Sequence, residues 1–86
     1  MGFFRLTYRA SVEKDIRSIP REFTDAIATR IDSLAQNPFP IGYKKLAGKE
    51  AYRIRVGNYR IVYTVRMDNK AVIIEKIKHR KDIYRK

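Results

Sequence analysis

The chain has 86 residues, with 20 Lys/Arg against 9 Asp/Glu and a formal net charge of +11 at pH 7. A chain of this length builds one domain around one core, so we expect residues 1–86 to form a single domain. The sequence contains no cysteine, which excludes disulfides, thiolate metal sites and cysteine nucleophiles. No apolar run approaches the roughly 20 residues of a membrane span. We therefore expect a cytoplasmic protein that does not bind membranes.

The positive charge is concentrated in the second half of the chain. Residues 1–42 hold six Lys/Arg and five Asp/Glu, a net charge of +1, whereas residues 43–86 hold fourteen and four, a net charge of +10. Such a surface attracts nucleic acid, an acidic membrane or an acidic protein partner. The competing interpretation is a solvated face that keeps the protein soluble.

The first half predicts one strand and a short helix. Residues 3–9 alternate loosely and include Phe, Leu, Thr and Tyr, which is typical of a strand. Ser11 is a good helix N-cap. Val12, Ile16 and Ile19 recur at i, i+4 and i+7, which indicates a short amphipathic helix.

A second helix is predicted from about Arg21 to Gln36. The preceding Pro20 suits its first turn. Its apolar side chains fall on one stripe, which predicts that this face belongs to the core; they are Phe23, Ile27, Ile31 and Leu34.

Residues 52–63 predict a β-hairpin closed by the two-residue turn Gly57-Asn58. This turn sets Arg55 opposite Arg60 and makes alternate residues share a face. The core face is then Tyr52, Ile54, Val56, Tyr59, Ile61 and Tyr63. The other face carries Arg53, Arg55 and Arg60. Because opposed like charges destabilise a sheet, the three guanidinium groups indicate a bound anion, most simply phosphate.

A last strand is predicted from Ala71 to about Lys78, after a turn at Asp68-Asn69. The polar tail that follows forms one helical turn or a loop. The expected order is β-α-α-β-β-β, an α+β fold with an antiparallel sheet and a helical hairpin packed on one face. The arginine-bearing face of the sheet is then open to a ligand.

Three segments carry a family resemblance: Lys45-Leu46-Ala47-Gly48, the hairpin of residues 52–63, and His79-Arg80-Lys81-Asp82-Ile83-Tyr84. Together with the element order, they make the whole chain resemble the RelE/ParE superfamily of toxin-antitoxin proteins. The tail is similar to the RelE branch, whose members cleave messenger RNA. The ParE branch, which inhibits DNA gyrase, shares the hairpin but usually lacks this tail.

The RelE resemblance implies a ribosome-dependent endoribonuclease that needs no metal or other cofactor. A ribose 2′-hydroxyl attacks the adjacent phosphate of the mRNA codon in the ribosomal A site. The resemblance maps the catalytic positions onto Arg53, Arg55, Arg60, Arg80 and Tyr84. It assigns Arg60 and Arg80 to charge stabilisation, and Tyr84 to base stacking or to positioning the 2′-hydroxyl.

The chain departs from well-known bacterial RelE proteins, which have lysine where this chain has Arg53 and Arg55. Arginine cannot give up its proton in a protein, so no hairpin lysine serves as base. His79, the sole histidine, is one candidate for proton transfer, because histidine changes charge near neutral pH. The alternatives are a structural or merely exposed His79, and a site that works only by binding phosphate while the ribosome supplies part of the chemistry.

Further contacts and partners follow from the resemblance and the charge. Candidate contacts to RNA or the ribosome are Lys44, Lys45, Lys49, Lys78 and Lys81. A RelB-like antitoxin is expected to cover the basic surface, and the pair to bind promoter DNA through the antitoxin. Two other functions remain open: a ParE-like gyrase inhibitor, and a catalytically inactive nucleic-acid-binding relative.

Overall fold

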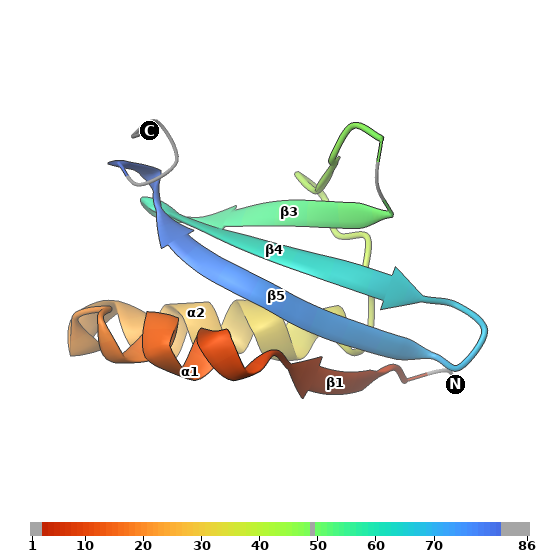
Figure 1. Ribbon diagram of the computed structural model, residues 1–86, viewed down its shortest axis with the longest axis horizontal. Coiled ribbons are helices and arrows are strands. Elements are labelled where there is room, and N and C mark those ends of the chain that lie inside the picture. The colour runs from red at the N-terminus through yellow and green to blue at the C-terminus, as the bar shows by residue number, and fades with distance from the viewer. Residues whose placement is uncertain (1–2, 49, 82–86) are drawn as a thin grey trace.

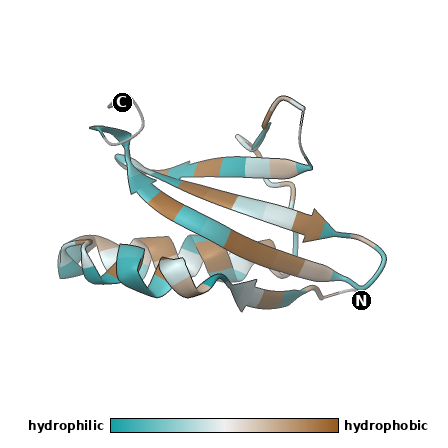
Figure 2. Ribbon diagram, viewed as in Figure 1, coloured by the Kyte–Doolittle hydropathy of each residue, from teal (hydrophilic) through white to brown (hydrophobic). Residues whose placement is uncertain are grey.

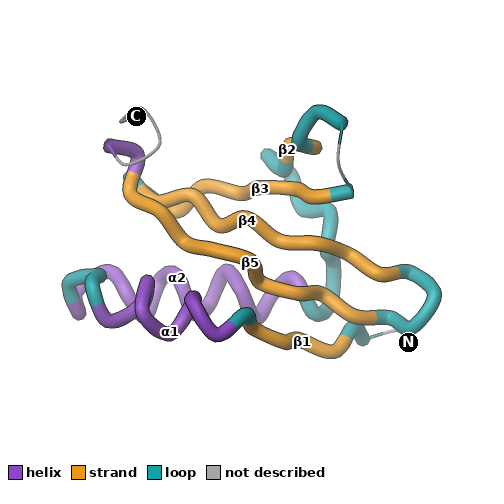
Figure 3. Tube along the Cα trace, in the orientation of Figure 1, coloured by secondary structure: helices purple, strands orange, loops and turns teal. Residues whose placement is uncertain are grey.

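The computed structural model describes residues 3–48 and 50–81. Within them (Figure 1), the elements are β1 (Arg5–Tyr8), α1 (Ala10–Arg17), α2 (Arg21–Leu34), β2 (Lys44–Lys45), β3 (Ala51–Val56), β4 (Tyr59–Arg66) and β5 (Ala71–His79). The strands form one sheet in the order β1-β5-β4-β3-β2. Both helices lie on the same side of this sheet (Figure 3). The α+β class and the helical hairpin on one face are therefore confirmed.

The sheet differs from the expected one in two ways. Three strand pairs are antiparallel, but β1 pairs parallel with β5, so the sheet is mixed. The added strand β2 has only two residues, and Lys44 pairs with Arg53 and Lys45 with Tyr52. The pairing of β1 with β5 joins segments that are far apart in the chain, and β2 is too short to show a strand pattern, so no local pattern in the sequence indicates either feature.

The β3–β4 hairpin has the predicted register. Val56 pairs with Tyr59 and Arg55 with Arg60. Gly57 has a φ of +59°, whereas Asn58 has no positive φ, which fits a type II′ turn with glycine at its first central position. The positive φ at Gly57 explains why a glycine stands there.

The core lies between the helices and one face of the sheet, and apolar residues alternate with polar ones along the strands (Figure 2). Its largest fully buried side chain is that of Tyr63, whose hydroxyl donates a 2.6 Å hydrogen bond to the carbonyl oxygen of Pro38. Burial raises the pKa of Tyr63 far above its ordinary value. The buried residues of the hairpin are those predicted, with Tyr52 and Val56 partly buried at its margin.

Several predicted boundaries in the first half are wrong. The first strand spans only residues 5–8, because the N–H of Phe4 bonds to Ala35 at the end of α2. Ser11 lies inside α1, and Arg9 occupies the N-cap position, since a single residue links β1 to the helix. The second helix ends at Leu34 and not at Gln36.

Two members of the predicted helical stripes are exposed at the ends of the helical hairpin. Ile16 is 36% exposed and Phe23 is 43% exposed, although Phe23 still contacts the ring of Tyr59. Neither helix is long and apolar enough to cross a membrane, as far as the described residues extend.

The strand β5 has an irregular edge that α1 covers. Val62 faces Lys76 while Tyr63 faces Ile74, so Glu75 is an extra residue in a β-bulge. Beyond Ile74 the strand has no β1 partner, and the Asp15 carboxylate of α1 accepts a 3.0 Å hydrogen bond from the Ile77 N–H. The strand continues through His79, one residue beyond the predicted end.

Candidate anion-binding site

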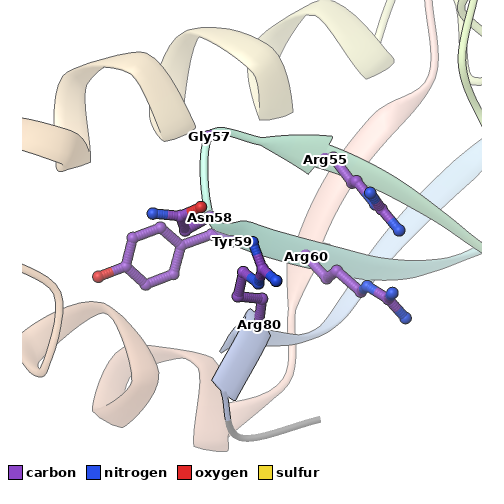
Figure 4. A pocket seen from close by; sticks show the side chains of 6 residues that line it. All are labelled: Arg55, Gly57, Asn58, Tyr59, Arg60 and Arg80. Atoms are coloured by element: carbon purple, nitrogen blue, oxygen red, sulfur yellow. The ribbon is translucent and has the colours of Figure 1, made fainter. Parts of the chain in front are cut away.

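Three of the predicted arginines line one pocket at the turn end of the β3–β4 hairpin (Figure 4). Arg55 extends from β3 and Arg60 from β4, and Arg80 is the residue that directly follows β5. The remaining lining comes from Gly57, Asn58 and Tyr59, and the pocket has a volume of about 160 Å³. This volume suits a small anionic group such as a phosphate.

Main-chain contacts bring the three arginines together. Arg55 and Arg60 are direct cross-strand partners on the face that the helices leave open. The N–H of Arg80 donates a 2.7 Å hydrogen bond to the carbonyl oxygen of Asn58 in the turn. This bond fixes the start of the tail beside the hairpin, so that Arg80 completes the pocket.

The described residues that line the pocket carry three positive charges and include no acidic side chain. In residues 3–48 and 50–81, the ion pairs involve none of Arg55, Arg60 and Arg80. Guanidinium groups grip phosphate oxygens bidentately, and clustered cations are relieved by an anion between them. The arrangement is therefore suited to hold a phosphate and to stabilise added negative charge on it.

The other predicted basic residues do not all share this site. Arg53 lies on the same face and lines a neighbouring pocket with Arg55 and Lys44. Lys45 pairs with Tyr52 and so lies on the opposite face from Lys44. Lys78 is the cross-strand partner of Arg60.

The ammonium group of Lys78 lies 3.5 Å from a carboxylate oxygen of Asp15 on α1. This lysine is thus tied to the helical side of β5 as well as being on the basic face. Lys81 is exposed, one residue beyond Arg80. The predicted residues Lys49 and Tyr84 lie outside the described residues.

His79 is held on the helix-covered side of the sheet. It is the cross-strand partner of Tyr59, and the two rings meet edge to face with centroids 5.1 Å apart. Its Nδ1 accepts a 3.1 Å hydrogen bond from the N–H of Lys81. His79 does not line the arginine pocket.

A separate charged cluster stands at the β-bulge. Glu75 accepts hydrogen bonds from Arg9, at 2.9 Å and 3.4 Å, and from the Thr64 hydroxyl at 2.8 Å. Partial burial by itself raises the pKa of Glu75, but these hydrogen bonds and the charge of Arg9 outweigh it and hold the pKa below its ordinary value. Glu75 therefore serves as an ion-pair partner. Across the described part of the chain, no cluster of three His, Asp or Glu side chains is arranged to hold a metal ion.

Sequence reasoning misses two contributors to the basic face. The sequence pattern marks Asn58 only as a turn residue, yet its carbonyl anchors Arg80. Arg30 of α2 lines the pocket beside Arg53 and Arg55. The sequence could have indicated Arg30 through its position next to Ile31. A residue at this margin of the buried stripe points along the edge of the sheet.

Comparison with known proteins agrees with this fold. The family model described as "ParE toxin of type II toxin-antitoxin system, parDE" matches residues 6–84. Toxin RelE3 of Methanocaldococcus jannaschii is 33% identical over 85 residues, covering 93% of this chain and 94% of that protein.

Two solved structures extend the likeness to three dimensions. The RelE-RelB complex of Pyrococcus horikoshii is similar with a TM-score of 0.81 and 30% identity, covering 93% of this chain and 97% of that one. The E. coli RelBE complex shares the fold at a TM-score of 0.76 and 20% identity, covering 90% and 95%.

The fold and the basic hairpin thus define a toxin of the RelE/ParE superfamily. This chain belongs to the ParE toxin family of type II toxin-antitoxin systems.

Proposed function

We propose that this toxin is a ribosome-dependent endoribonuclease that cleaves mRNA in the A site and so inhibits translation. The observation that carries the proposal is the convergence of Arg55, Arg60 and Arg80 on one pocket. The likeness to RelE toxins supports the same reaction.

In the proposed reaction, the 2′-oxygen of a ribose bonds to the adjacent phosphorus while the bond from phosphorus to the 5′-oxygen breaks. The products are a 2′,3′-cyclic phosphate and a 5′-hydroxyl. Negative charge accumulates on the phosphate oxygens in the transition state. Arg60 and Arg80 stabilise this charge, and Arg55 holds the phosphate between them.

Proton transfer falls to groups other than the described residues that line the arginine pocket. Among residues 3–48 and 50–81, the lining consists of arginine, glycine, asparagine and tyrosine, and it includes neither the histidine nor a carboxylate. Arginine stays protonated and so supplies charge without acting as a base. We assign the acid and base tasks to Tyr84 and to ribosomal groups around the bound codon.

A RelB-like antitoxin is the proposed inhibitory partner. RelE proteins of two archaea have been solved in complex with RelB, and both resemble this chain at 30% identity or more. An acidic antitoxin segment complements the basic face and prevents the pocket from reaching RNA. Binding of promoter DNA then depends on the antitoxin.

The first prediction concerns Arg60→Ala and Arg80→Ala. Removing one group that stabilises the transition state costs about 10²–10³-fold in rate. We therefore expect each variant to lose growth arrest and to lose cleavage by that factor. The measurement is primer extension on mRNA from a reconstituted translation reaction, with and without ribosomes. Arg55→Lys should retain much of the activity, because it keeps the charge.

Arg66→Ala is the matched control, since it removes an exposed arginine of β4 outside the arginine pocket. It should cut like the unmodified toxin. Full activity in both Arg60→Ala and Arg80→Ala would disprove the nuclease site. Growth arrest with intact mRNA would instead favour the second candidate, gyrase inhibition, which the ParE family match supports. A gyrase supercoiling assay would then test it.

A further inference from the structure

We infer that a second phosphate subsite, formed by Arg30, Lys44, Arg53 and Arg55, binds the RNA strand one nucleotide step away from the arginine pocket. This inference rests on the proposed nuclease function and extends it. The four cationic side chains line a pocket of about 540 Å³ together with Ile41 and Gly42.

Tertiary contacts assemble this subsite at the edge of β3. Lys44, the first residue of the short strand β2, pairs with Arg53. Beyond Arg53, toward Arg55, β3 has no β2 neighbour. The helix α2 packs against β3 from the other face. Arg30 on α2 therefore reaches the same edge, and the pocket joins the open face to the helical side.

Among the described residues, the lining of this subsite includes four cationic side chains and no carboxylate. The ion pairs formed among residues 3–48 and 50–81 involve none of Arg30, Lys44 and Arg55. Arg30 is partly buried. Cations held this close together favour an anion among them.

Two features identify the anion as part of a polynucleotide. Arg55 lines both pockets, so anions bound in them are neighbours, as successive phosphates of one strand are. Ile41 is 99% exposed beside the second pocket and presents an apolar surface to a base or ribose. A single-stranded RNA fits this pairing of phosphate and apolar contacts, because its bases are free to turn toward the protein.

The test measures binding of 2′-O-methyl RNA, which cannot be cleaved, to the purified toxin by fluorescence anisotropy across a salt series. Arg30→Gln should weaken binding of a hexanucleotide about tenfold. It should also make the slope of log affinity against log salt shallower by about 0.7, which is the contribution of one phosphate contact on a single strand. Binding of a dinucleotide, which fills only the arginine pocket, should not change.

Arg21→Gln is the matched control, because it removes the same charge from the same helix outside both pockets. Lys44→Gln is a second variant of the subsite at an exposed position, and it keeps the test decisive if Arg30→Gln disturbs folding. In cleavage assays Arg30→Gln should raise KM and leave kcat unchanged.

Unchanged hexanucleotide binding in both Arg30→Gln and Lys44→Gln would overturn the subsite. The subsite would also be overturned if these two variants lost binding only to an acidic peptide of equal charge and not to RNA. That result would identify the surface as a protein-binding one. Weakened RNA binding with no mRNA cleavage by the unmodified toxin would uphold the subsite and reject the nuclease. Normal mRNA cleavage by the unmodified toxin, together with unchanged hexanucleotide binding by Arg30→Gln, would uphold the nuclease and reject the subsite.

Discussion

At the scale of single residues, His79 illustrates how geometry assigns a role. The chemistry of the sole histidine makes it a candidate for proton transfer, but its ring packs against Tyr59 and lies outside the lining of the arginine pocket. Its Nδ1 accepts the N–H of Lys81, two residues on, in the manner of a helix N-cap. Because Arg80 lies between these residues, we propose that His79 is a positioning residue for Arg80.

The second prediction compares His79→Asn with His79→Ala. Asparagine accepts the same N–H hydrogen bond and is a favourable N-cap, so His79→Asn should keep most of the cleavage rate. Alanine loses the cap, worth about 1 kcal/mol, and should slow cleavage roughly fivefold. The measurement is the rate of mRNA cleavage in the reconstituted translation reaction.

The two roles of His79 make different predictions for the asparagine variant. A proton-transfer residue contributes about 10²–10⁴-fold, and neither asparagine nor alanine replaces it. Equal and severe loss in both variants would therefore reject positioning and establish His79 in proton transfer.

At the scale of elements, α1 protects the part of β5 that β1 does not reach. Asp15 is 14% exposed, and its two carboxylate oxygens contact the Ile77 N–H and the Lys78 ammonium group. A strand edge left without partners carries unpaired N–H groups that favour aggregation. One helix side chain thus replaces a strand neighbour and ties the helical hairpin to the sheet.

The third prediction is that Asp15→Ala destabilises the fold. The Ile77 N–H, on a residue that is 3% exposed, loses its partner, and such a group costs about 1–3 kcal/mol. For a domain of this size each 1 kcal/mol lowers Tm by roughly 4–8 °C. Thermal unfolding followed by circular dichroism measures the change.

Glu13→Ala is the control for Asp15→Ala, because it removes a carboxylate from the same helix that only forms an exposed pair with Arg17. Such pairs contribute about 0.3–0.5 kcal/mol. Equal Tm values for the two variants would show that Asp15 does not support β5.

At the scale of the whole molecule, the dominant feature is uncompensated charge. The chain carries +11, and its basic side chains concentrate on the hairpin face that the helices leave open. Self-repulsion of like charges opposes the compact state. We therefore expect the isolated toxin to gain stability from anything that screens or occupies this face, including salt and the RNA and acidic antitoxin proposed above.

The fourth prediction is that the Tm of the isolated toxin rises with salt. The Debye length is about 30 Å at 0.01 M and about 10 Å at 0.1 M, so repulsion across the face weakens over this range. Phosphate should raise the Tm more than chloride at equal ionic strength, because it also binds the folded protein. Differential scanning calorimetry measures both series. A Tm that stays constant or falls as salt rises would contradict the charge repulsion. Equal Tm values in phosphate and in chloride would contradict specific phosphate binding.

The parts of the protein that depend on short-range rules can be predicted from the amino-acid sequence. A two-residue turn and a side-chain period of two leave one register for the β3–β4 hairpin, so the pairing of Arg55 with Arg60 follows from the sequence alone. The 3.6-residue period likewise locates α2 and its buried stripe, although not its last turn.

Contacts between distant segments, in contrast, depend on how the elements pack in three dimensions. The two-residue strand β2 is too short for a local pattern to indicate it, and the parallel pairing of β1 with β5 and the bond from Arg80 to Asn58 join residues far apart in the chain. The same holds for Arg9 with Glu75, 66 positions apart, and for Arg30 at the edge of β3. Local patterns determine which face a side chain takes within its own element. The packing of elements on a common core then sets which faces lie side by side, and in this toxin that packing completes both basic pockets.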